Sequence, residues 1–83
     1  MKFTFSQHAD TVVKERQISQ AWLEDAVFEP ERTESDRMDP ELEHRLRRIK
    51  EHGNRVLRVV IVKGTDPVRI VTAYFDRKMK DEL

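Results

Sequence analysis

Residues 55–75, RVLRVVIVKGTDPVRIVTAYF, decide the fold of this chain. Two runs of aliphatic and β-branched residues, 56–62 and 68–75, are typical of strands, and apolar residues occupy both alternating positions. Between them, Gly64 allows a positive φ and Pro67 cannot donate a hydrogen bond, as expected at a chain reversal. The stretch therefore predicts a β-hairpin at the centre of a sheet, buried on both sides.

Before this hairpin, the N-terminal part of the chain predicts one strand and two helices. Residues 2–5 alternate polar and apolar, as a short half-buried edge strand does. Ser6 is a suitable N-cap for a helix over residues 7–16, and Ser19 for a second helix that ends near residue 28. Two helices joined by so few residues predict a compact pair that covers one face of the sheet.

The middle of the chain contains the ambiguous segment. Residues 29–43 are polar and acidic, which predicts a loop. The residues around 41–50 place Leu42, Leu46 and Ile49 at helical spacing, so a helix is one alternative. The turn signal at residues 53–54 leads directly into the hairpin and favours a strand, because a meander of neighbouring strands is the simplest topology.

The summed prediction is a single α+β domain over residues 1–83 with the order β-α-α-β-β-β. The sheet is expected to be antiparallel, with both N-terminal helices on one face. The predicted parts are a strand plus helix pair (2–28), an acidic loop (29–43), antiparallel strands (44–77) and a charged tail (78–83).

Composition narrows the classes of function. The chain has no cysteine and only two glycines, so thiolate ligands and a glycine-rich phosphate loop are both excluded. The histidines at 8, 44 and 52 lack metal-ligand spacing, and we expect no metal and no cofactor. No apolar run is long enough to span a membrane and no signal-peptide pattern is present, so we expect a cytoplasmic protein without a membrane partner.

Charge is unevenly distributed although the formal net charge is zero. Residues 24–43 carry nine acidic and two basic side chains, whereas residues 44–80 carry eleven basic and three acidic ones. Either the acidic segment folds over the basic strands and neutralises them, or a basic sheet face remains available to phosphates.

Arg45, Arg47, Arg48 and Arg55 form the densest basic cluster. On paired strands, alternate members would project from one face. Arginine holds phosphate by bidentate hydrogen bonds, so such a patch suits nucleic-acid binding along an RNA backbone. The alternative is a solvated strand face paired with the acidic loop.

Three further residues are candidate catalytic groups. Arg58 interrupts an apolar strand, and it is either an ion pair to a loop carboxylate or a clamp for phosphate charge. His8 is either a general acid or base, or a histidine that holds helix to sheet by a hydrogen bond. Arg77 follows the last strand and is the second candidate for stabilising phosphate charge.

Several short motifs together resemble a family of small bacterial proteins of unknown function. They are Phe5-x-x-His8-Ala9, Glu15-Arg16-x-Ile18, Trp22, Arg55-Val56-Leu57-Arg58-Val59-Val60 and Val71-Thr72-Ala73-Tyr74-Phe75-Asp76-Arg77. The resemblance covers residues 3–77 and implies the strand, helix entry and terminal hairpin expected above. Val12 stands where that family has arginine. Either a His–Arg pair that serves catalysis in relatives is incomplete here, or the arginine is only a surface residue in the family.

More distantly, the predicted element order is similar to the RelE, ParE and BrnT toxin folds. That likeness implies a toxin-like architecture and, for many such proteins, RNA cleavage without metal. The sequence thus leaves two functions open. The first is a non-catalytic interaction module that uses a sheet edge or the acidic loop to hold an antitoxin-like protein partner or a second copy. The alternative is an RNA-binding protein or metal-independent ribonuclease.

Overall fold

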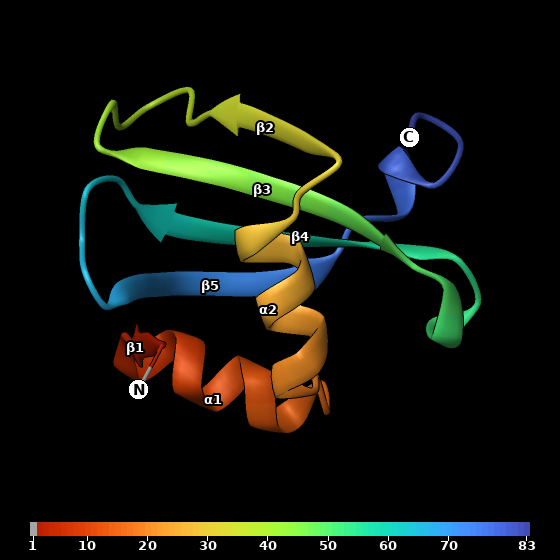
Figure 1. Ribbon diagram of the computed structural model, residues 1–83, viewed down its shortest axis with the longest axis horizontal. Helices are drawn as coiled ribbons and strands as arrows, with labels where there is room; N and C mark the ends of the chain where they lie inside the picture. The colour runs from red at the N-terminus through yellow and green to blue at the C-terminus, as the bar shows by residue number, and fades with distance from the viewer. Residues whose placement is uncertain (1) are drawn as a thin grey trace.

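The computed structural model describes residues 2–83 and has an α+β fold with two helices and a five-stranded mixed sheet (Figure 1). The strand order is β1-β5-β4-β3-β2, which places β4 at the centre. The strands are β1 (Phe3–Phe5), β2 (Arg32–Ser35), β3 (Leu42–Ile49), β4 (Arg55–Val62) and β5 (Val68–Phe75). The helices are α1 (Gln7–Glu15) and α2 (Gln20–Phe28), with 3₁₀ turns η1 (Lys50–His52) and η2 (Arg77–Met79).

The predicted central hairpin is confirmed as β4 and β5, which pair antiparallel. Gly64 makes the reversal with a φ of 72°. Six consecutive residues of β4, 56–61, are buried, so both faces of this strand are covered as its apolar composition predicts. Three alternate residues of β4, Leu57, Val59 and Ile61, belong to the main hydrophobic core.

The ambiguous segment is a strand, and the helical alternative is wrong. β3 pairs antiparallel with β4 from Leu42 to Ile49. Gly53 and Asn54 turn the chain between them in the left-handed region, with φ of 64° and 58°. The long pairing with β4 outweighs the helical spacing of apolar residues, which is a local signal only.

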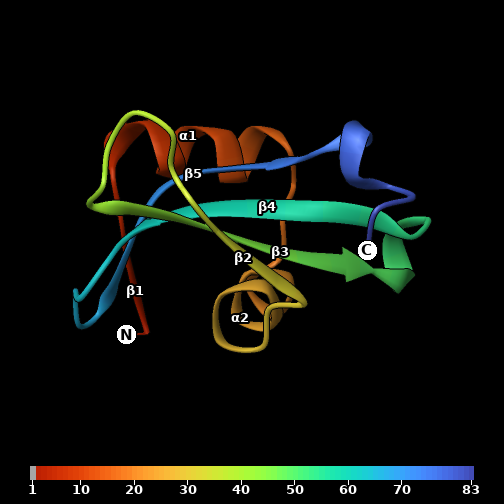
Figure 2. The same ribbon diagram turned by 90° about the horizontal axis from the view of Figure 1, so that it is seen from above.

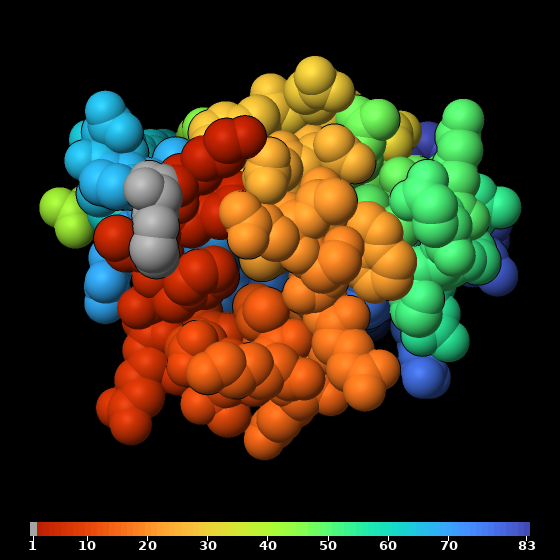
Figure 3. All heavy atoms as spheres, turned by 60° about the horizontal axis from the view of Figure 1, so that its bottom comes forward, coloured from red at the N-terminus to blue at the C-terminus, as the bar shows by residue number. Residues whose placement is uncertain are grey.

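Both predicted N-caps are confirmed. The Ser6 hydroxyl accepts a hydrogen bond from the N–H of Ala9 at 3.0 Å, and the Ser19 hydroxyl accepts one from Trp22 at 3.2 Å. α2 lies across β3 and β4 and buries Leu23 against them. In the space-filling view, which brings the β1 edge forward, α1 and α2 lie side by side on the side turned to the viewer (Figure 3).

The prediction that both helices share one face needs correction. α1 runs along the outer edge of β5, whereas α2 lies on the face of the sheet (Figures 1 and 2). Ala9 of α1 reaches the main core, but His8 contacts Thr72, which pairs with Val60 on the opposite face. The reason is that β1 pairs with only the first half of β5, and α1 then continues along the remaining edge.

The expected antiparallel sheet is also corrected, because β1 pairs parallel with β5. Two helices and three strands separate β1 from β5 in the chain, so no hairpin dictates the direction of β1. Parallel pairing places the Phe3 side chain in the core, where it is 3% exposed.

The prediction that the acidic segment 29–43 is a loop is wrong for part of that segment. The segment contains β2 and the first residues of β3. β2 pairs antiparallel with β3 from Arg32 to Ser35. Its residues are polar, and its strand conformation comes from this pairing rather than from an apolar pattern. Within residues 2–83, no helix is long and apolar enough to cross a membrane.

Candidate functional site

The sheet face away from α2 holds the guanidinium of Arg58, the one charged side chain among residues 2–83 that is buried. Its neighbours Leu57 and Val59 point into the core, so strand alternation directs Arg58 to the other face. Only 8% of Arg58 is exposed. A charge so far removed from water must be paired.

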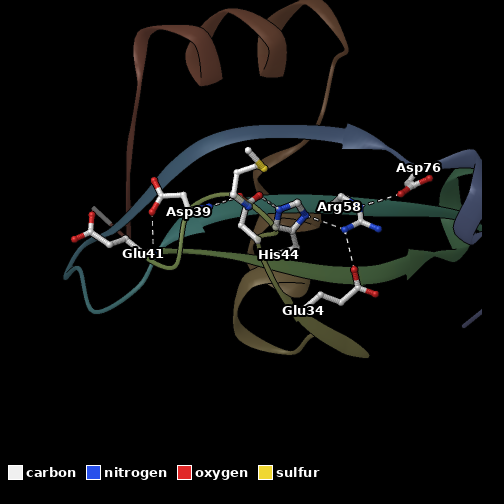
Figure 4. Close-up of polar contacts among 8 residues, drawn as sticks. Glu34, Asp39, Glu41, His44, Arg58 and Asp76 are labelled. Atoms are coloured by element: carbon white, nitrogen blue, oxygen red, sulfur yellow. Dashed lines mark hydrogen bonds and ion pairs between the residues drawn. The ribbon is translucent and has the colours of Figure 1, made fainter.

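Neighbouring strands supply three partners for Arg58 (Figure 4). Its Nε donates to Asp76 Oδ2 at 2.9 Å, just after β5. Its Nη1 donates to Glu34 Oε1 on β2 at 3.1 Å and lies 2.8 Å from His44 Nδ1 on β3. Burial alone would lower the pKa of Arg58, but the hydrogen bonds to Glu34 and Asp76 outweigh it and raise that pKa.

The contact with Arg58 determines the tautomer of His44. Because arginine has no acceptor, His44 Nδ1 must accept the hydrogen bond and carry no proton. The proton of the neutral ring is therefore on Nε2, which donates to Asp36 Oδ1 at 2.7 Å. The N–H groups of Met38 and Asp39 also donate to Asp36, both at 3.0 Å to Oδ2.

These hydrogen bonds hold the pKa of Asp36 below its usual value, first through His44 and then through the two backbone N–H groups. The network, defined as Glu34, Asp36, His44, Arg58 and Asp76, therefore contains three carboxylates and one guanidinium. Its excess of negative charge disfavours an incoming phosphate. Every buried side-chain nitrogen or oxygen in the described chain already has a partner.

The candidate catalytic residues are not gathered at one point. His8 Nε2 contacts Thr72 Oγ1 at 3.2 Å, and Thr72 pairs with Val60, which pairs with His44. With strands about 4.8 Å apart, Thr72 and His44 are separated by roughly two strand spacings, and His8 contacts the Thr72 end of this row. The histidine beside Arg58 is therefore His44 rather than His8.

Arg77 lies in η2, next to the Asp76 that binds Arg58. It lines a surface hollow of about 260 Å³. The other lining residues are Gly53, Arg55, Val56, Phe75, Asp76 and Lys80. Three cationic side chains around one hollow favour a small anion over a cation.

The four arginines predicted to bind nucleic acid do not form one patch. Arg45 and Arg47 donate to Val27 O and Glu29 O, each at 2.6 Å. Both carbonyls lie at the end of α2, where backbone oxygens lack helical partners. Arg48 alternates to the opposite face and donates to carbonyls of the C-terminal segment 80–83.

The remaining arginine of the set, Arg55, lines the hollow beside η2 and is exposed. Arg45 also donates to the Glu43 carboxylate at 2.8 Å. The side chains of the cluster thus hold neighbouring segments of the protein together. Among residues 2–83, no group of three histidine or acidic side chains is arranged to hold a metal ion.

A second feature, missed by sequence reasoning, is the outer edge of β2. The Asp36 N–H donates to Leu42 O at 3.3 Å, so the backbone groups of Asp36 point toward β3. Glu34 lies two residues earlier, and its backbone groups therefore point toward β3 as well. In an antiparallel pair only every second residue bonds to its neighbour. The N–H and C=O groups of Thr33 and Ser35 therefore point outward.

The pairing on β3 supports this assignment independently. The Lys63 N–H donates to Glu41 O, so odd-numbered residues of β3 bond to β4 and even-numbered residues bond to β2. Arg48 is the next even residue beyond the end of β2. Its N–H donates to the Glu31 carboxylate at 3.0 Å in place of a strand carbonyl.

On the opposite side of the sheet, β1 is the edge strand and covers part of β5. Val68 N donates to Lys2 O, and Ser6 N donates to Ile70 O, so β1 and the start of α1 cover the first part of β5. Farther along, the Arg16 side chain donates to Ala73 O at 2.7 Å. The sheet therefore ends in two edge strands, β1 with three residues and β2 with four, and β2 is the longer edge.

Comparison with known proteins gives one match. A family model described as a domain of unknown function (DUF4258) matches residues 5–75, from the end of β1 to the end of β5. The matched region contains β2, His44 and Arg58. No curated protein and no solved structure matches the chain. The predicted likeness to RelE and ParE toxins stays a prediction.

Proposed function

Because the chain belongs to the DUF4258 family, whose function is unknown, we propose a function from its site: a non-catalytic interaction module that binds a protein strand along β2. The proposed location is the cytoplasm. The observation that carries this proposal is the outward direction of the Thr33 and Ser35 backbone groups on β2, an end strand of the sheet where both residues are exposed. Such groups add a strand from a partner through main-chain hydrogen bonds.

The buried network supports the proposal by holding β2 in place. Glu34 of β2 is bonded to Arg58, and Asp36, just after β2, is bonded to His44. A four-residue polar strand would otherwise have little to keep it extended. Because the edge is already ordered, a partner strand loses less free energy in ordering it.

The same network argues against catalysis at Arg58. Its guanidinium donates to two carboxylates and His44, and both ring nitrogens of His44 are occupied. A general acid or base needs an exchangeable proton within reach of a substrate. Here the proton on His44 Nε2 is directed to Asp36.

A second candidate function, an RNA-binding protein or metal-independent ribonuclease of the RelE type, is favoured by one observation. Arg55, Arg77 and Lys80 surround the hollow beside η2, where a phosphate is compatible with the local charge. This candidate requires His8 to act some distance away, across β5, and it uses neither Arg45 nor Arg47. It is therefore the weaker of the two.

Photocrosslinking tests the interaction module. A photoreactive benzoylphenylalanine in place of Ser35 is expected to form protein adducts, because residue 35 lies on the outer edge of β2. Adding Thr33→Pro should abolish them, since proline removes one outward N–H while Glu34 keeps its bonds to β3. Thr33→Val retains the N–H and should leave the adducts unchanged.

The matched control places the same photoreactive residue at Arg69, an exposed position on β5 beside the covered edge. Adducts of equal yield from position 69, or adducts that persist with Thr33→Pro, would contradict binding along β2. Circular dichroism should give the same spectrum for the Thr33 variants, so that loss of adducts reports the edge rather than unfolding.

A further inference from the structure

We infer that the strand bound by β2 is β2 of a second copy of this chain, antiparallel, with Thr33 opposite Thr33 on a two-fold axis. This inference rests on the proposed use of the β2 edge and specifies its occupant. The two five-stranded sheets would form one continuous sheet. The ribbon views place neither helix over the outer side of β2 (Figures 1 and 2).

Backbone geometry limits the ways in which two copies of β2 can pair. Only residues whose N–H and C=O point outward can form a hydrogen-bonded pair with the second strand. In β2 these are Thr33 and Ser35. A symmetric antiparallel pair must therefore place odd-numbered residues opposite odd-numbered residues, and the axis passes through Arg32, Thr33, Glu34 or Ser35.

Charge selects one of these registers. An axis at Arg32 places two arginines opposite each other, and an axis at Glu34 places two glutamates opposite each other, which is unfavourable in both cases. An axis at Ser35 places Glu34 opposite Asp36 twice. An axis at Thr33 places Arg32 of each copy opposite Glu34 of the other, so two opposite-charge pairs form.

The side chains of the free edge suit this arrangement. Arg32 and Glu34 point to the same face of the sheet, and their closest approach within one chain is a loose 3.7 Å between Nη1 and Oε2. Glu34 binds Arg58 through its other oxygen, Oε1. Arg58 leaves Oε2 unbound and the Glu34 side chain is 39% exposed, so Arg32 of a second copy would meet this oxygen.

The Thr33 and Ser35 side chains point to the other face of the sheet from Arg32 and Glu34. In the Thr33 register, the axis brings the two Thr33 side chains together on that face. Threonine pairs directly across antiparallel strands are favourable. A four-residue strand forms a small interface, so the dimer is expected to be weak and dependent on concentration.

Cysteine trapping tests the register, because the natural chain contains no cysteine. In a Thr33→Cys variant the two cysteines face each other across the axis, with Cα atoms about 5.5 Å apart, which permits a disulfide. Mild oxidation should convert most of the protein to a covalent dimer on a non-reducing gel. In the matched Ser35→Cys variant the cysteines are about 14 Å apart. That variant should give at least tenfold less dimer.

Charge exchange provides a second test that does not use cysteine. Arg32→Glu should lower self-association at least tenfold in sedimentation equilibrium, since it places like charges opposite each other twice across the axis. The matched Arg32→Lys variant keeps both opposite-charge pairs and should leave self-association unchanged. Circular dichroism of each variant alone establishes that it is folded.

The outcomes separate this inference from the proposed function. Equal trapping of both cysteine variants, or equal self-association of Arg32→Glu and Arg32→Lys, would overturn the Thr33 register. A monomer at about 1 mM that Thr33→Cys fails to trap would overturn the second copy as partner. Photocrosslinks from β2 to a different protein, still sensitive to Thr33→Pro, would then leave the interaction module standing.

Discussion

At the scale of single residues, Arg58 links the strands that the chain order keeps apart. It lies on β4 and bonds to Glu34 of β2, to His44 of β3 and to Asp76 beyond β5. Removing one member of a buried ionic group leaves the others desolvated and unpaired, which costs more than the group itself contributes. The stability of the sheet face away from α2 therefore depends on this one side chain.

We expect Arg58→Met to lower the free energy of unfolding by about 3 kcal/mol, because Glu34 and Asp76 lose their counter-charge. Urea denaturation at neutral pH measures the change. The matched control is Arg69→Met on β5, an exposed arginine whose side chain makes no hydrogen bond. A change of less than about 0.5 kcal/mol is expected there. Equal effects of the two substitutions would contradict the assigned role of Arg58.

Asp36 gives a pH prediction with a definite sign. Its pKa is below the ordinary value of 3.8, first because of the His44 hydrogen bond and then because of two backbone N–H groups. A carboxyl with a lower pKa in the folded state stabilises the fold above its unfolded value and loses that contribution as pH falls through the folded value.

Asp36→Asn should therefore be less stable than the natural chain at pH 7. The difference should stay constant down to about pH 5 and shrink below the ordinary pKa of aspartate. Thermal unfolding of both proteins from pH 7 to pH 2 measures the constant stability difference at higher pH and its decrease at lower pH. A difference that grows as the pH falls would refute the assigned hydrogen bonds.

At the scale of elements, sequence reasoning succeeds where the determining signal is local. Ser6 and Ser19 are N-caps because their hydroxyls meet N–H groups three residues later. The hairpin of β4 and β5 combines two β-branched runs with a turn at Gly64. In each case the residues that set the structure are neighbours in the chain.

β2 and the direction of β1 depend on distant residues instead. Glu34 is held by Arg58, which lies 24 positions later in the chain. A polar four-residue segment carries no apolar alternation, so its strand conformation has no local signature. Likewise β1 pairs with β5, and nothing within residues 3–5 specifies the direction of that partner. Sequence alone predicts neither.

The two N-caps should differ in importance although both are serines. Ser6 also donates its hydroxyl to Val71 O on β5 at 2.9 Å, so it joins α1 to the sheet edge. Ser19→Ala should cost about 1 kcal/mol of unfolding free energy. Ser6→Ala should cost about 2 kcal/mol because a part-buried bond between elements is lost as well. Urea denaturation compares them, and a larger cost at Ser19 would contradict this ranking.

At the scale of the whole molecule, part of the uneven charge is paired internally. The acidic segment pairs with the basic strands, as Glu34 does with Arg58 and Glu43 with Arg45. Pairing of the acidic segment with the basic strands is one of the two alternatives that the sequence predicts, the other being a basic sheet face open to phosphates. The sequence could not predict that Arg45 binds the end of α2 and Arg48 the C-terminal segment, because that depends on which elements cover each face of β3.

The same limit applies to the candidate site. Arg58 was identifiable from its place in an apolar strand. His44 was not, because only the pairing of β3 with β4 brings it to Arg58. The position of His8 at a helix start predicts a general acid or base. In the structure, α1 instead places His8 beside Thr72 of β5, away from Arg58.

Incubation with a structured RNA in EDTA tests the whole assignment. We expect the RNA to remain intact with the natural chain, His8→Ala and Arg58→Ala alike, because the described part of the chain presents no free acid or base beside a free guanidinium. Intact product on a denaturing gel after prolonged incubation is the expected result. Cleavage by the natural chain that both substitutions abolish would contradict a non-catalytic module, because it would require His8 and Arg58 to act together. Such a result would also imply a rearrangement of β5, since Thr72 and Val60 lie between His8 and the Arg58–His44 contact.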